Sequence, residues 1–281
     1  MLQYLEDHFD LSDTKFVGAS AGSLLSALTL CHVPAKAAIL EAYRLAVEAG
    51  AFDRPLGLAG VWGNLVSTWL GTLLPEDAHK RCSGRATIVV ARVPNMELIG
   101  VDAFATRDEL LRSLLASCHV PFVLDGRPWV PWDHHQTGPL DSVMDGSLME
   151  FFDPSRASYH PFYDEGTQHG IVIDYFLDEE LEYNRMSFLQ LRDFPHVLNY
   201  VRRGYEYGRR IHARGELSML SPRSFPRDTL DLDGVLHEGA RIREANRGPG
   251  GGDPPVVVER AKGRRRGKRR DAGDGGGTAT M

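Results

Sequence analysis

The chain has 281 residues, of which 42% are hydrophobic, and a formal net charge of −6. No apolar run reaches the roughly 18 residues of a membrane-spanning helix, and the first residues lack the basic and apolar regions of a signal peptide. The three cysteines are scattered and odd in number, which argues against a disulfide framework or a zinc site. We therefore expect a cytoplasmic protein.

Charge is distributed unevenly along the chain. Residues 248–281 carry eight Lys or Arg against four Asp or Glu, so the rest of the chain is the acidic part. An acidic body argues against nucleic acid as a partner. The Gly, Pro and Arg content of residues 248–281 predicts a disordered tail. Its basic run at 264–270 is interpreted as solvated, with a nuclear signal or an anchor to an anionic surface as alternatives.

Hydrophobic periodicity predicts alternating helices and strands. The first half contains an expected helix over 1–9, a strand over 15–17, helical sequence over 23–50 interrupted near Pro34, strands over 86–93 and 97–104, and a helix over 107–117. The second half contains an expected strand beginning near 129–131, a polar loop over 134–141, a strand over 170–175 and a helix over 187–213 broken at Pro195. Residues 56–74 fit either a buried helix pair or a lipid-facing lid.

The sequence Gly-Ala-Ser-Ala-Gly at 18–22 fits the pattern of a nucleophile elbow, with a strand expected before it and a helix after it. The flanking Gly18 and Gly22 permit close approach of backbone segments. The turn presents Ser20 as a candidate nucleophile, and the backbone N–H of Ala21 lies at a helix N-terminus, where it can stabilise an oxyanion.

A serine hydroxyl needs a base to take its proton. One scheme uses a histidine in a Ser-His-Asp triad, and the candidates are His134, His135, His160 and His169. The other uses Asp145, which a glycine follows, in a Ser–Asp dyad. Only 17 residues precede Gly18, too few for the strands that precede the elbow in an α/β-hydrolase. Adjacent histidines on an extended segment point in opposite directions, so we expect His134 and His135 in solvent rather than on a metal.

Four segments in order resemble the patatin-like phospholipase family, acylglycerol lipase and adiponutrin-like branch: GASAGSL at 18–24, LLPEDAH at 73–79, ASCHVPF at 116–122 and DGS at 145–147. The resemblance covers about residues 1–155. It implies a three-layer α/β/α sandwich with a mostly parallel central sheet and no cofactor or metal. It also implies that Ser20 is the nucleophile, that Asp145, supported by Gly146, is the general base, and that the substrate is an acylglycerol or phospholipid.

The sequence departs from that family in two respects. It has Asp-Gly-Ser where the family usually has Asp-Gly-Gly or Asp-Gly-Ala, and no strand or glycine-rich oxyanion loop precedes the first helix. We expect either a truncated hydrolase domain or an impaired member that serves as a lipid-associated scaffold. The expected divisions are a hydrolase domain at 1–215, an irregular extension at 216–247 and the tail at 248–281. Association with lipid droplets or membranes is expected to be peripheral.

Overall fold

A computed structural model describes residues 1–54, 58, 60–151, 170–173, 193–225 and 230–246. These residues belong to one compact unit that extends from Met1 to Asn246. Two of the sequence predictions, the strand over 170–175 and the helix over 187–213, are described only in part, and the tail lies outside the described residues.

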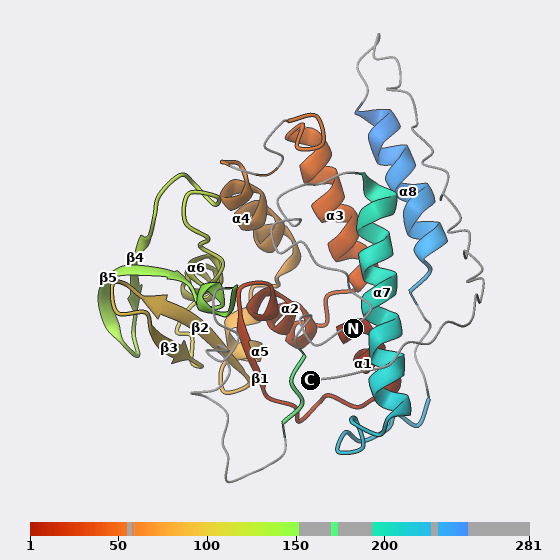
Figure 1. The fold of residues 1–281 in the computed structure, drawn as a ribbon, viewed down its shortest axis with the longest axis horizontal. Coiled ribbons are helices and arrows are strands. Elements are labelled where there is room, and N and C mark those ends of the chain that lie inside the picture. The colour runs from red at the N-terminus through yellow and green to blue at the C-terminus, as the bar shows by residue number, and fades with distance from the viewer. Residues whose placement is uncertain (55–57, 59, 152–169, 174–192, 226–229, 247–281) are drawn as a thin grey trace, which may run out of the picture. The chain divides into compact units, whose positions relative to one another are not determined.

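The first half of the chain mixes helices and strands, with four helices in succession between β1 and β2 (Figure 1). The elements there are α1 (Leu2–His8), β1 (Phe16–Ala19), α2 (Ala21–Leu30), α3 (Ala35–Glu48), α4 (Trp62–Leu73), α5 (Ala78–Cys82), β2 (Ala86–Arg92), β3 (Glu97–Val101) and α6 (Arg107–Ser117). They are followed by β4 (Val130–His134), β5 (Gly138–Asp145), the short 3-10 helix η1 (Leu148–Phe151), α7 (Phe194–Ala213) and α8 (Leu232–Ala245). The α/β class predicted from sequence is confirmed.

The strands form one sheet in the order β1-β2-β5-β4, with β3 also paired to β2. Strands β1 and β2 run parallel, in a register that places Gly18 opposite Ile88. The pairings β2–β3, β2–β5 and β4–β5 are antiparallel. Among the described strands, the parallel pairing expected from sequence is present between β1, which leads into the elbow, and β2. Hairpin turns account for the antiparallel pairs β2–β3 and β4–β5, because short turns can join only antiparallel strands.

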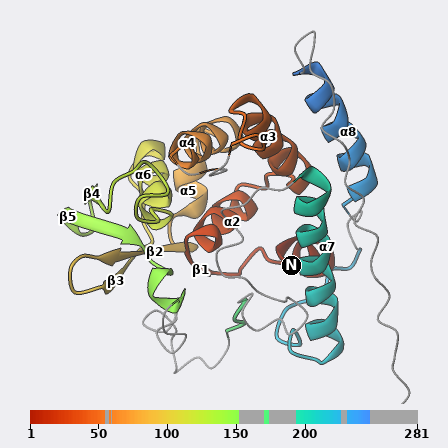
Figure 2. The same cartoon turned by 45° about the horizontal axis from the view of Figure 1, so that its top comes forward.

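Strand β2 is buried on both faces, as a strand inside a layered sandwich must be. Ile88 and Val90 face the main hydrophobic core with side chains of α2, α5 and α6. Val89 and Ala91 point to the opposite face and are equally inaccessible to solvent. Figure 2 shows α2, α5 and α6 beside the strands, with α3 and α4 further from the sheet.

Four predicted segments differ from the structure. Residues 134–141, expected as a polar loop, form the end of β4, the turn and the first half of β5, in which Gly138 takes a φ of 68°. Residues 170–173 have no regular secondary structure. Pro195 lies in the first turn of α7, where its missing N–H costs no hydrogen bond, so it starts that helix instead of breaking it. In the span expected to be irregular, 216–247, α8 is capped by the Asp231 side chain and packs against α3.

Within residues 56–74, predicted as either a buried helix pair or a lid, α4 covers 62–73. Val66 and Leu70 of α4 are buried in the main core, and the Trp69 indole donates a hydrogen bond to the carbonyl of Ala38. These contacts favour the buried helix over the lid. In the part of the chain that the structure describes, no helix combines the length and apolar character needed to cross a membrane.

Candidate active site

Ser20 lies between the end of β1 and the start of α2, in a backbone conformation that side chains rarely adopt. Its φ is 52° and its ψ is −128°. Such a conformation is strained and persists only where neighbouring contacts enforce it. One such contact is the close packing of Gly18 against Gly22: a Cβ at position 18 would lie 2.5 Å from the carbonyl carbon of Gly22. The first glycine of the motif is therefore required for the close approach of strand and helix.

The backbone of Ser20 is held by a residue that the sequence analysis did not select. The Ser20 N–H donates to Ser117 Oγ at 3.0 Å and to the Ser117 carbonyl at 3.2 Å. Ser117 Oγ in turn donates to the carbonyl of Val89 at 2.7 Å. Ser117 is fully buried at the end of α6. Its only sequence signal was its place in the ASCHVPF segment.

Asp145 is the last residue of β5, where its register partner is Val90 of β2. Its backbone N–H donates to the carbonyl of His119 at 3.0 Å. The carboxylate oxygen Oδ1 accepts hydrogen bonds from the N–H and the hydroxyl of Ser147, both at 2.8 Å. Oδ2 is buried and has no hydrogen-bond partner among the described residues. The carboxyl group is thus fixed through one oxygen and free to accept through the other.

Burial governs the charge of Asp145. Desolvation raises the pKa of this carboxyl to about 6, although the side chains of Ser20 and Ser147 and the Ser147 amide lower it in part. The Ser20 side chain is thus close enough to act on the carboxyl electrostatically, while the geometry stops short of a completed hydrogen bond to Oδ2. A carboxylate with a pKa near neutrality is suited to general-base catalysis.

Gly146 explains how the two side chains come together. A Cβ on this residue would lie 2.5 Å from the carbonyl oxygen of Val89 and 3.2 Å from the Cβ of Ala19. Only glycine lets the end of β5 pack this closely against the end of β1. The structure therefore brings Asp145 close to the elbow that carries Ser20. Ala21 and Gly22 form the exposed first turn of α2, next to Ser20.

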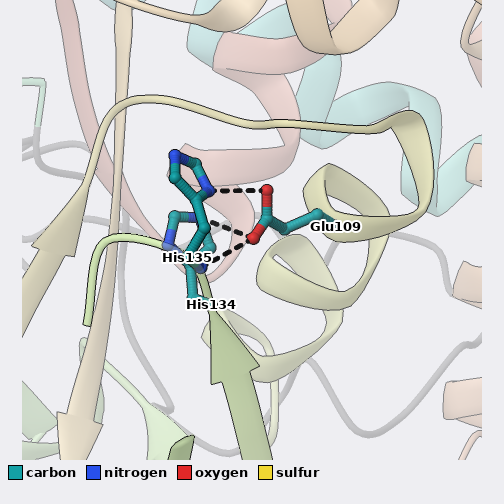
Figure 3. A group of neighbouring side chains, drawn as sticks. All are labelled: Glu109, His134 and His135. Carbon is teal, nitrogen blue, oxygen red and sulfur yellow. Dashed lines mark hydrogen bonds and ion pairs between the residues drawn. The ribbon is translucent and has the colours of Figure 1, made fainter. Parts of the chain in front are cut away.

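Of the four candidate triad histidines, two contact Glu109 and two lie outside the described residues. His134 and His135 contact Glu109 at the start of α6 (Figure 3). His134 is 1% exposed, so its expected position in solvent is wrong: as the last residue of β4 it points into the packed side of the hairpin. His160 and His169 lie outside the described residues. His119, by contrast, is buried and accepts the Asp145 amide through its backbone carbonyl.

A groove of about 590 Å³ lies between α4, α6 and the β4–β5 hairpin. Apolar side chains dominate the lining, among them Leu115, Leu124, Val130 and Leu140. His119, two residues beyond Ser117, also lines it. The volume is in the range of small-molecule sites.

An elbow serine between a parallel strand and a helix, facing a buried aspartate, defines the chain as an α/β protein with nucleophile-elbow architecture. No protein-family model matches the chain. It is 36% identical over 114 residues to the rat (Rattus norvegicus) patatin-like phospholipase domain-containing protein 2. It is 30% identical over 109 residues to the mouse (Mus musculus) 1-acylglycerol-3-phosphate O-acyltransferase Pnpla3. It is 27% identical over 113 residues to the human (Homo sapiens) omega-hydroxyceramide transacylase.

Each of these alignments covers 38% of this chain, and 23%, 26% and 20% of the respective relative. The chain thus matches about a fifth to a quarter of the length of these relatives. The aligned part of the chain is therefore similar to patatin-like phospholipase domain proteins. The family resemblance of the sequence motifs is confirmed.

Proposed function

We propose that this protein transfers acyl groups from lipid esters through Ser20 and Asp145. The observation that carries the proposal is the junction of β1 and β5, where Gly146 lets the buried carboxyl of Asp145 approach the elbow serine. Hydrolysis of acylglycerols or phospholipids is the reaction we favour. Names of relatives include both a phospholipase domain protein and acyl-transferring enzymes, which supports a common acyl-enzyme step.

The chemistry proceeds in two halves. Ser20 Oγ attacks the ester carbonyl carbon while Asp145 accepts the hydroxyl proton, and collapse of the tetrahedral intermediate expels the alcohol, which takes that proton. Asp145 then removes a proton from water, which attacks the acyl-enzyme; the fatty acid is released as Ser20 Oγ leaves and takes that proton back from Asp145. An alcohol in place of water gives transacylation with the same balance of atoms and protons.

Two further parts of the site support this chemistry. The Ala21 N–H, in the first turn of α2, is positioned next to the reacting hydroxyl and favours negative charge on the carbonyl oxygen. The apolar groove beside His119 offers a surface for an acyl chain. A lipid substrate implies access to an interface, so we also propose peripheral association with lipid droplets or membranes.

The decisive experiment compares the wild type with Ser20→Ala and Asp145→Asn on emulsified triacylglycerol and on phospholipid vesicles. Released fatty acid and newly esterified acceptor alcohol are measured separately. We expect turnover in the wild type, a loss of at least about 10³-fold in each variant, and labelling of Ser20 by a fluorophosphonate probe. Ser12→Ala, at an exposed turn serine, is the control and keeps full activity.

The same experiment distinguishes the enzyme from the alternative function, a lipid-associated scaffold. A wild type with no turnover and no Ser20 labelling, together with vesicle binding that Ser20→Ala leaves unchanged, would replace the enzyme by the scaffold. Loss of turnover in a histidine variant with Asp145→Asn still active would instead replace the dyad by a triad.

A further inference from the structure

Three potential metal ligands, Glu109, His134 and His135, lie together where α6 begins and β4 ends (Figure 3). One ligand atom from each residue lies within 4.8 Å of the other two. His135 Nδ1 is 2.8 Å from Glu109 Oε2, and His134 Nε2 is 3.9 Å from Glu109 Oε1. Nothing in the elbow chemistry uses these residues.

His134 supplies the independent indication of a ligand. Its ring is fully buried, and Nε2 has no hydrogen-bond partner among the described residues. A buried polar nitrogen without a partner carries a free-energy penalty that natural structures rarely leave uncompensated. This nitrogen faces the Glu109 carboxylate at a separation too long for a hydrogen bond.

We propose that Glu109, His134 and His135 bind a divalent transition-metal ion of the zinc class. In tetrahedral coordination with bonds of about 2.0–2.1 Å, ligand atoms lie about 3.3 Å apart. The two separations from the Glu109 carboxylate, 2.8 and 3.9 Å, lie on either side of that value. Imidazole nitrogen and carboxylate oxygen are ligands that Zn²⁺ accepts readily. An ion bridging Nε2 and the carboxylate would supply the missing partner.

The tautomers needed for binding are accessible without loss of a proton. His134 Nδ1 now accepts the Gln136 N–H at 3.2 Å, which places the ring proton of the neutral form on Nε2. On binding, that proton moves to Nδ1 and the long Gln136 hydrogen bond opens. His135 Nδ1 now donates its proton to Glu109 Oε2 at 2.8 Å, because a carboxylate oxygen can only accept. On binding, that proton moves to Nε2, which can be solvated because the side chain is 44% exposed.

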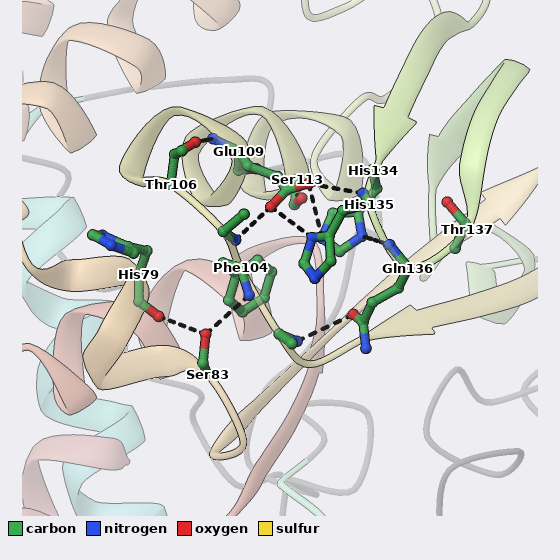
Figure 4. A network of polar contacts seen from close by, with 12 residues as sticks. His79, Ser83, Phe104, Thr106, Glu109, Ser113, His134, His135, Gln136 and Thr137 are labelled. Carbon is green, nitrogen blue, oxygen red and sulfur yellow. Dashed lines mark hydrogen bonds and ion pairs between the residues drawn. The ribbon is translucent and has the colours of Figure 1, made fainter.

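The surrounding network holds the ligands in position, as metal sites require. Glu109 accepts hydrogen bonds from the backbone N–H of Ala105 at 2.6 Å and of His135 at 2.8 Å. Gln136 joins the neighbouring loop, since its side-chain oxygen accepts the N–H groups of Asp102 and Ala103 (Figure 4). The ion would therefore connect α6 to the β4–β5 turn and act on stability.

The test uses the full-length, untagged protein after dialysis against a chelator, titrated with ZnCl₂ by calorimetry and with Co²⁺ by visible absorption. We expect one ion per chain, ligand-field bands of tetrahedral Co²⁺, and a melting temperature raised by about 5–10 °C at a hundredfold excess over Kd. His135→Ala and Glu109→Gln, each checked for folding by circular dichroism, should weaken binding at least about 100-fold.

His237→Ala, at an exposed histidine of α8, is the matched control and should bind like the wild type. Equal affinity in the wild type, His135→Ala and Glu109→Gln would overturn the proposal, because the ion would then bind elsewhere. Absence of Zn²⁺ binding to the wild type would also overturn it and leave the cluster as a hydrogen-bonded clamp without an ion.

Discussion

The backbone N–H of Ser20 donates a hydrogen bond to the side chain of Ser117, 97 positions later in the chain, at 3.0 Å. Ser117 Oγ itself donates a hydrogen bond to the Val89 carbonyl, so one hydroxyl connects α6, β2 and the elbow. The next turn of the chain holds the other half of the site, since the His119 carbonyl accepts the Asp145 amide. Segment 117–119 thus fixes both members of the proposed dyad through main-chain contacts.

Ser117→Ala tests this positioning role. The change leaves the Val89 carbonyl without its donor and removes one of the two acceptors of the Ser20 N–H, so we expect stability to fall by about 1–3 kcal/mol. We also expect kcat for ester turnover to fall about tenfold with KM little changed, because a displaced elbow affects the reacting atoms more than the bound chain.

Ser113→Ala is the matched control for Ser117→Ala. Ser113 is also fully buried on α6, and its hydroxyl donates to the Glu109 carbonyl of its own helix at 2.8 Å. We expect a comparable or smaller loss of stability, measured by urea unfolding, and wild-type kcat. Equal losses of kcat in the two variants would mean that Ser117 has a structural role only.

The two glycines of the elbow motif should respond differently to alanine. A Cβ at Gly18 would meet the Gly22 backbone at 2.5 Å, whereas a Cβ at Gly22 meets nothing within 4 Å. Gly18→Ala should therefore destabilise the fold by about 3 kcal/mol through overpacking against backbone that cannot move aside. Gly22→Ala should be neutral or gain about 0.5 kcal/mol from helix propensity in α2. Thermal unfolding of both variants decides, and a stable Gly18→Ala protein would contradict the packing argument.

Local sequence was sufficient to predict the parts of the site that local geometry creates. The elbow needs a strand, a special turn and a helix, and all three have signals between residues 15 and 30. Asp145 followed by Gly146 was identified partly through family resemblance, because an Asp-Gly pair alone is a common turn. The requirement for glycine at 146 comes from Val89 and Ala19, which are distant in sequence.

The errors in the prediction lie where tertiary contacts outweigh local pattern. The β4–β5 hairpin contains His134, Gln136 and Thr137, which read as a polar loop, yet Glu109 on α6 compensates the polar groups of the turn. In α8, the glycines lower helix propensity, but Gly239 gives Phe194 of α7 the room to pack against it. The role of Ser117 has no local pattern behind it beyond its place in the ASCHVPF segment, because its partners Ser20 and Val89 are distant in sequence.

The pH dependence of turnover should report Asp145. Only the ionised carboxylate can accept the Ser20 proton, and burial raises the pKa of this group to about 6. We therefore expect kcat/KM to rise about tenfold per pH unit below pH 6 and to level off above it. The measurement is a pH profile on a soluble short-chain ester. A plateau that extends down to pH 4 would show that Asp145 is not the base.

The same buried carboxyl makes a separate prediction about stability. Its folded-state pKa of about 6 lies above the ordinary value of 3.8, so folding favours the protonated form. This contribution to the free energy of unfolding is complete below pH 3.8 and is lost as the pH rises through 6. At pH 7.5 the ionised, buried group costs the native state up to about 3 kcal/mol.

Asp145→Asn removes that cost, so the inactive variant should be more stable than the wild type at pH 7.5. The difference should shrink as the pH falls toward 4, where both side chains are neutral. Urea unfolding at pH 4, 6 and 7.5 measures it, with Asp13→Asn, at an exposed turn residue, as the control that lacks this trend. A wild type more stable than Asp145→Asn at pH 7.5 would mean that the carboxylate has native partners strong enough to offset its burial. In the structure Oδ1 accepts two hydrogen bonds from Ser147, whereas Oδ2 has no partner among the described residues. We therefore expect these partners to be too few to offset the burial of the carboxylate, and Asp145→Asn to be the more stable protein at pH 7.5.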